Sequence, residues 1–113
     1  MIKRMEDFNL QKTRRDSEKI KILDHEFSFT ISTFEELDDC WGRSNAMYGW
    51  IKIAKECGPD QHSSTLLHEV IHCILDLNDL KKCADDETTI SVLAAGILSF
   101  IKSNPEIVKK MMK

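Results

Sequence analysis

The chain has 113 residues, of which 42% are hydrophobic and 31% charged, and its net charge is −3. This length is typical of one small domain, and the composition is typical of a soluble globular protein. The weak negative charge argues against a protein that binds nucleic acid or a membrane surface. The longest apolar run, residues 90–101, is too short to cross a bilayer, which takes about 20 residues.

Residues 1–17 are a charged N-terminal segment that we expect to be an arm outside the folded domain, with a short helix as the alternative. Residues 1–21 carry seven basic and four acidic side chains, whereas residues 22–113 carry nine and fifteen. A basic arm can contact nucleic acid, but a solvated, mobile segment accounts for it with fewer assumptions. We therefore assign residues 18–113 to a single folded domain.

The N-terminus and the cysteines predict the compartment. The N-terminus is charged and lacks the apolar stretch of a secretory signal. No Cys-x-x-Cys pair occurs among the four cysteines, Cys40, Cys57, Cys73 and Cys83. We interpret them as reduced thiols of a cytoplasmic protein, with a disulfide framework as the alternative.

Alternation of apolar and polar residues predicts strands in the first half of the chain. Within residues 18–32 the apolar positions are Ile20, Ile22, Phe27, Phe29 and Ile31. This spacing predicts a β-hairpin that turns at Asp24-His25, with His25 exposed to solvent. Residues 47–55 predict a third strand, with Ile51 and Ile53 on one side.

Residues 33–45 connect the hairpin to the third strand. An acidic stretch, residues 34–40, predicts a short helix capped by Thr33, and residues 41–45 predict a turn. The acidic side chains can bind a cation, but such a run is usually a solvated face.

Helical periodicity dominates the second half. The first long helix is expected at about residues 64–80, after the breaker Gly58-Pro59, with a hydroxyl among residues 63–65 as its cap. A polar connector, residues 81–84, leads to a second long helix that Asp85 or Asp86 can cap. Its apolar stripe is Ile90, Leu93, Ala94, Ile97 and Ile101. We expect this stripe to be buried.

Asn104-Pro105 ends the second long helix and starts a final short one. We expect the final helix to pack against the domain through its apolar residues, Ile107, Val108, Met111 and Met112. The elements together predict a small α+β domain, with a short antiparallel sheet of about three strands packed on two long helices.

Residues 66–72 read Leu-Leu-His-Glu-Val-Ile-His and contain the pattern His-Glu-x-x-His. On a helix, His68 and His72 lie one turn apart, so both imidazoles can reach one ion. Glu69 is rotated by about 100° from His68 and flanks the ion, where a general base is needed. A chance match, or a core helix with two hydrogen-bonded histidines, is the alternative. We interpret the pattern as a zinc site with Glu69 as the catalytic base.

A catalytic zinc site has three protein ligands and one open position. Glu87 is the first candidate for the third ligand, because it continues the apolar stripe of the second long helix, where a carboxylate is costly unless paired or metal-bound. It can instead be an exposed acid that favours the helix N-terminus. Asp76, one turn beyond His72, is the second candidate, as a ligand or as an acceptor that orients an imidazole. Asp85 and Asp86 are weaker candidates.

The chain resembles the zincin-like metallopeptidases, and within them small phage and prophage proteins distantly similar to the ImmA/IrrE type. The matching segments are residues 65–72, Thr-Leu-Leu-His-Glu-Val-Ile-His, residues 87–98, which begin Glu-Thr-Thr-Ile, and the tail Asn104-Pro105-Glu106. Ile71 and the pair Ile90-Ser91 differ from the residues usual in that type. The resemblance implies a zincin-like fold, zinc held by His68, His72 and Glu87, Glu69 as general base, and a bacterial host cytoplasm.

The expected reaction is hydrolysis of a protein or peptide, in which zinc activates water and polarises the carbonyl while Glu69 removes a proton. An extended substrate can add to the edge of the strand that contains Ile51 and Ile53. Three side chains are candidates for the donor to the oxyanion, with Tyr48 preferred: Tyr48, Arg43 and His62.

Two other functions stay open. The chain can be a zinc-stabilised binding module, such as a phage protein that captures a host factor without cleaving it, and Glu69 then has no catalytic role. It can also be a regulator that uses its basic arm on DNA, although no recognition helix is evident. We expect a protein or peptide partner and no membrane partner.

Overall fold

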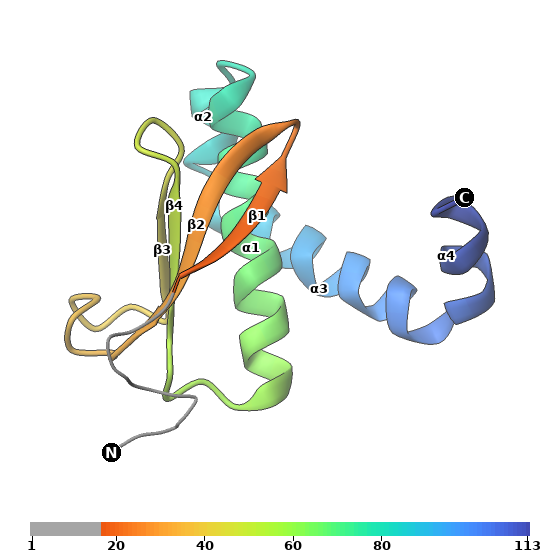
Figure 1. Ribbon diagram of the computed structural model, residues 1–113, viewed down its shortest axis with the longest axis horizontal. Helices are drawn as coiled ribbons and strands as arrows, with labels where there is room; N and C mark the ends of the chain where they lie inside the picture. The colour runs from red at the N-terminus through yellow and green to blue at the C-terminus, as the bar shows by residue number, and fades with distance from the viewer. Residues whose placement is uncertain (1–16) are drawn as a thin grey trace.

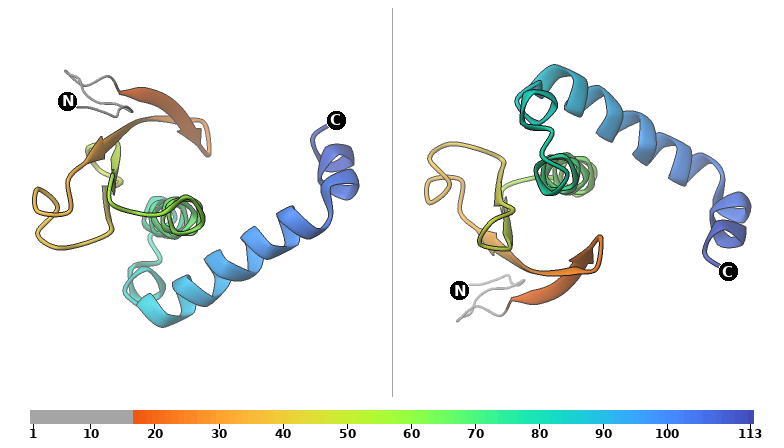
Figure 2. Two further views of the ribbon diagram at one scale, coloured as in Figure 1. Left: turned by 90° about the horizontal axis from the view of Figure 1, so that it is seen from below. Right: turned by 90° about the horizontal axis from the view of Figure 1, so that it is seen from above.

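The computed structural model describes residues 17–113. The predicted N-terminal arm and its alternative short helix lie almost wholly outside this range. The described chain is an α+β fold with a four-stranded sheet and four helices, and α1 packs along one face of the sheet (Figure 1). Figure 2 looks along α1, with the sheet on one side of this helix and α3 crossing on the other.

The predicted β-hairpin is present. Strands β1 (Glu18–Ile22) and β2 (His25–Ser32) pair in antiparallel register. The turn is formed by Leu23 and Asp24, whose φ angles are 50° and 67°. Two positive φ values are the mark of a type I′ turn, which matches the twist of a hairpin. The turn therefore lies one residue before the predicted Asp24-His25, and His25 is an exposed strand residue.

The sheet is mixed, so the prediction of three antiparallel strands is wrong. A further strand, β3 (Gly42–Asn45), pairs antiparallel with β4 (Trp50–Ala54), and β4 pairs parallel with β2. The strand order is β1-β2-β4-β3. We expected a turn at residues 41–45, but the chain turns at residues 46–49, ending at Gly49 with a φ of 72°. As a result β4 is an interior strand and β3 is an edge.

The short acidic helix predicted at residues 34–40 is absent, and this segment is a series of turns. Its predicted cap is present. Thr33 Oγ1 accepts from the Glu36 backbone N–H at 3.0 Å, while Glu36 Oε1 accepts from the Thr33 N–H at 2.8 Å, which is a capping box. The helix does not continue because Asp38 and Asp39 have φ values of 57° and 61°, outside the right-handed helical region.

Helix α1 (Pro59–Leu77) begins five residues before the predicted start. Gly58 is the N-cap and Pro59 is the first helical residue, a position that suits proline because its missing N–H has no partner there. The hydroxyls of residues 63–65 are therefore inside the helix and do not cap it. This helix contributes Cys73 to the buried core, which comprises Ile22, Phe27, Ile51, Ile53 and Cys73.

The polar connector is a short helix, α2 (Lys81–Ala84), and α3 (Glu87–Ser103) follows. Asp86 caps α3, as predicted, by accepting from the Thr89 backbone N–H at 3.1 Å. The buried stripe is confirmed only at Ile90 and Ala94. Its other members, Leu93, Ile97 and Ile101, are 48%, 42% and 39% exposed. The reason is the crossing angle, since only the first turns of α3 lie against α1 and the rest projects away (Figure 1).

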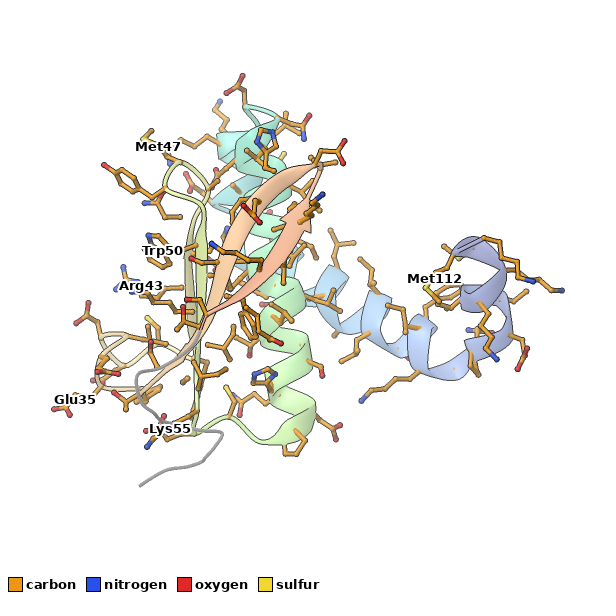
Figure 3. All side chains as sticks on the ribbon, in the orientation of Figure 1. Glu35, Arg43, Met47, Trp50, Lys55 and Met112 are labelled. Carbon is orange, nitrogen blue, oxygen red and sulfur yellow. The ribbon has the colours of Figure 1, made fainter. Side chains whose placement is uncertain are left out.

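Helix α4 (Pro105–Met111) follows the predicted Asn104-Pro105 boundary. It does not pack against the domain as predicted, and Ile107, Met111 and Met112 are exposed. Figure 3 shows Met112 at the end of this projecting arm, far from the sheet. No helix among the described residues is long and apolar enough to cross a membrane.

Candidate metal centre

Helix α1 presents His68 and His72 on the side that faces the start of α3. They are four residues apart, so their rings lie one turn from each other, with centroids 4.8 Å apart. Their Nε2 atoms are 3.1 Å apart. This short distance means that the two nitrogens point at one shared position. The side chains are 19% and 16% exposed, so this position lies near the surface.

Glu87, the first residue of α3, completes the cluster. Its Oε1 atom is 2.8 Å from His68 Nε2 and 3.1 Å from His72 Nε2. Asp86 fixes the start of α3 through its cap, and the two buried residues Ile90 and Ala94 hold the following turns in place. The structure therefore brings together the three residues that the sequence predicted as ligands, and they form a group that can hold a metal ion.

The three ligand atoms fit a metal ion better than they fit hydrogen bonds alone. Each imidazole can donate one proton from Nε2 to the carboxylate, but the two donors would then face each other at 3.1 Å. A tetrahedral ion with bonds of about 2.0–2.1 Å separates its ligand atoms by about 3.3 Å. The observed separations of 2.8–3.1 Å are close to that value. Two imidazoles and a carboxylate are also ligands common at transition-metal sites.

The charge state of Glu87 suits a ligand. Partial burial raises the pKa of Glu87, but hydrogen bonds and charge interactions with His72 and His68 lower it by more. The net pKa lies below the ordinary value for glutamate, so the carboxylate is ionised at neutral pH. Because its side chain is 66% exposed, solvent reaches the cluster from the Glu87 side.

Ser91 contacts His68, one of the clustered residues, and this contact was not predicted from the sequence. Its Oγ atom is 3.2 Å from His68 Nδ1. With Nε2 as the ligand atom, the proton of His68 lies on Nδ1 and Ser91 accepts it, as outer partners of metal-bound histidines commonly do. The spacing in the sequence could have indicated this contact. Ser91 follows Glu87 by four residues, so the two side chains lie on the same face of α3.

Glu69 lies beside the cluster and is not one of the ligands. It is 7% exposed, and Ser44 Oγ on edge strand β3 donates to its Oε1 at 2.6 Å. Glu69 thus borders the same depression as the three clustered residues. A buried carboxylate needs a partner, and here the partner comes from the strand that borders the site. Sequence separation hid Ser44, which is 25 residues from Glu69.

Edge strand β3 approaches α1 closely at Gly42. A Cβ atom there would lie 2.7 Å from Thr65 Cγ2, 3.1 Å from Ile53 Cδ1 and 3.2 Å from Glu69 Oε2. Only glycine leaves room for this contact. The absent side chain at Gly42 therefore sets the distance between β3 and Glu69.

Replacing Gly42 by alanine is expected to destabilise the protein by about 1–3 kcal/mol, because the added methyl group overpacks the contact with α1. For a domain of this size, each kcal/mol lowers the melting temperature by roughly 4–8 °C. Thermal unfolding followed by circular dichroism measures the effect. Gly96→Ala is the control, since nothing lies within 4 Å of its added Cβ and alanine favours a helix interior. Equal melting temperatures for the two variants would contradict this packing.

The other candidates lie outside the ligand cluster. Asp76 is exposed and lies one turn beyond His72, bordering the same depression. Asp86 is occupied as a helix cap, and Asp85 lies 3.9 Å from Lys81 Nζ. The structure thus favours Glu87 over all three as the third ligand, on the geometry of the ligand atoms.

The three proposed oxyanion donors do not reach the cluster. Tyr48 is 76% exposed in the 46–49 turn and does not border the site. His62 packs edge-on against Phe29, with centroids 6.1 Å apart, and burial lowers its pKa. Arg43 borders the site through its place on β3, but its guanidinium binds Asp38 at 2.9 Å. Figure 3 shows that side chain on the sheet face turned away from α1.

All four cysteines are free thiols, and their environments differ. Cys73 is fully buried beneath the site, and burial raises the pKa of its thiol to about 11. Because the thiolate is the reactive form, Cys73 is expected to resist iodoacetamide in the native protein, while exposed Cys40 and Cys83 react. Peptide mass spectrometry after timed labelling, with and without denaturant, measures this. Labelling of Cys73 at the rate of Cys83 in native protein would contradict the described packing.

Comparison with protein-family models, with curated proteins and with solved structures found no match to this chain.

Proposed function

We propose that this chain is a zinc-dependent metallopeptidase of the phage or prophage type, acting in the cytoplasm of a bacterial host. The observation that carries the proposal is the convergence of His68, His72 and Glu87 on one point, with buried Glu69 beside them. Nitrogen and oxygen ligands in this number, with an open side, suit catalytic zinc. A structural zinc site needs no carboxylate base next to that open side.

Each residue at the site has a separate role in the proposed reaction. Bound zinc would supply an acidified water molecule and a positive charge for the substrate carbonyl. Glu69 takes the proton from water and passes it to the leaving amine. Ser44 holds the Glu69 carboxylate by a hydrogen bond of 2.6 Å, so the base is oriented before substrate arrives. Ser91 orients His68 from the opposite side, through Nδ1.

An extended substrate binds along β3 in this proposal. The strand with Ile51 and Ile53, which we expected to be the edge, is interior and paired on both sides. Strand β3 has β4 on one side only, so its other backbone edge is available to a peptide strand. The same strand carries Gly42 and Ser44, which contact α1 at the site.

A binding module without peptidase activity is the second candidate function. It is favoured by the lack of an oxyanion donor from the predicted candidates within residues 17–113, since Tyr48, His62 and the Arg43 guanidinium all lie away from the ligand cluster. Such a module would hold a host protein on the same surface and use zinc only for stability.

The experiment that tests the proposal has two measurements. Elemental analysis of chain purified from a bacterial cytoplasm is expected to give about one zinc per chain. Proteomic mapping of N-termini in the expressing cells is expected to show new termini that an empty vector does not produce. Zinc without new termini would support the binding module. Absence of metal, with a melting temperature unchanged by added zinc, would overturn both functions.

A further inference from the structure

The surface between edge strand β3 and helix α1 is a continuous groove. Three depressions follow one another along it. The first is bordered by Trp41, Thr65 and Ala95, the second by Ser44, His72 and Asp76, and the third by Asn45, Met47 and Lys81. The first and second share Gly42, His68 and Glu69, and the second and third share Ser44 and Asp76. The middle of the groove thus passes over the ligand cluster of His68, His72 and Glu87.

The groove has a direction. Gly42 lies near Thr65 and Glu69, whereas Asn45 shares a depression with Leu77. Strand β3 therefore runs in the same direction as α1. Antiparallel pairing is the more stable arrangement for an added strand. A peptide paired in this way has its amino-terminal part on the Asp76 side of the cluster and its carboxyl-terminal part on the Trp41 side.

Asp76 lines the part of the groove that would hold the amino-terminal half of the peptide, and its carboxylate has no cation partner among the described residues. It is exposed on α1. Lys81, at the end of the same depression, has its amine 3.9 Å from Asp85. The carboxylate of Asp76 is therefore available to a group in the groove.

The spacing along the helix matches that along an extended peptide. Asp76 follows His72 by four residues, a rise of about 6 Å. Alternate side chains of an extended strand are about 6.7 Å apart. A substrate side chain that points toward α1, within two residues of the carbonyl at the metal cluster, therefore comes opposite Asp76.

We propose that Asp76 selects substrates with a lysine or arginine within the two residues that precede the cleaved bond. This inference rests on the proposed function and adds the substrate class to it. The pair would be solvent-exposed, so its contribution is that of a surface ion pair, which corresponds to an affinity change of roughly two- to fivefold.

Peptide binding to the zinc-loaded Glu69→Gln protein tests the selectivity without needing turnover. The probes are three pools of fluorescein-labelled 12-residue peptides, alike except for lysine, glutamine or glutamate at a fixed central position. Fluorescence anisotropy is expected to give the lysine pool a roughly two- to fivefold lower Kd than the glutamate pool. A second substitution, Asp76→Lys, is expected to reverse this ratio, and the ratio should shrink as salt is raised.

Asp79→Asn is the matched control, because Asp79 is an exposed acid just beyond the end of α1 that does not border the groove. It should leave the ratio unchanged. Equal binding of the three pools, or an unaltered ratio in the Asp76→Lys protein, would overturn the selectivity and leave the peptidase proposal standing. Failure of a zinc-loaded protein to bind any pool would overturn both, since no peptide would then occupy the groove.

Discussion

Replacing Glu69 by glutamine is expected to lower peptide cleavage by at least about two orders of magnitude while zinc stays bound. Glutamine keeps the size of the side chain and can still accept from Ser44 Oγ, but it cannot take a proton, and loss of a general base commonly costs this much. Glu69 is not among the three clustered ligands, so the metal content should not change. The rate is measured on a peptide that spans one of the new termini, and zinc is measured in the same sample.

Glu106→Gln provides the control, because Glu106 is an exposed acid on α4, away from the ligand cluster. It should leave both rate and metal unchanged. Two results would contradict the assignment of Glu69 as the base. One is a Glu69→Gln protein that cleaves at the wild-type rate. The other is that the wild-type and variant proteins have identical effects on host cells and neither produces new N-termini. That result would mean that α1 serves only as a scaffold.

The ligand variants should differ sharply in their zinc content. His68→Ala and His72→Ala are each expected to reduce zinc from about one per chain to near zero, because each removes one of three ligands. Glu87→Ala should weaken zinc far more than Asp76→Ala, since Glu87 Oε1 lies within 3.1 Å of both imidazoles whereas Asp76 is outside the cluster. Equilibrium dialysis against a zinc-buffered chelator measures the affinities. The reverse order for the two acids would move the third ligand onto α1.

Acid should release the ion, because a ligating imidazole must be neutral and protons compete with the metal for its nitrogen. Removing zinc should also lower the melting temperature, because the free energy of binding adds to that of folding.

The sequence was sufficient to predict the cluster of His68, His72 and Glu87 and insufficient for its surroundings, and the reason lies in sequence separation. His68 and His72 are placed by helical spacing alone, and Glu87 by its position at the start of the next apolar stripe. Strand β3 could not be predicted, because Gly42, Ser44 and Asn45 are residues typical of turns and become a strand only by pairing with β4. The hydrogen bond from Ser44 to Glu69 follows from that pairing and was hidden for the same reason.

Helix α3 illustrates a second limit. Its periodicity correctly predicts a helix with an apolar stripe, but periodicity does not reveal how far a partner helix extends along that stripe. Ile90 and Ala94 meet α1, whereas Leu93 and Ile97 do not become buried. The crossing angle of two helices depends on side chains of both, so it cannot be read from either segment alone.

Because Glu87 lies on a different helix from His68 and His72, an ion bound by all three would link two separate helices and restrict the unfolded chain. An ion held by His72 and Glu87 closes a loop of about 15 residues, and a covalent link across such a loop removes unfolded-state entropy worth about 3 kcal/mol. Helix α3 also packs on α1 through its buried residues Ile90 and Ala94, and Lys102 reaches α1 through one exposed ion pair with Asp60. If the proposed zinc binds, it would act as a removable crosslink that adds to the packing of α3 on α1, so the cellular supply of the ion would set how firmly the arm of α3 and α4 is held to the rest of the fold.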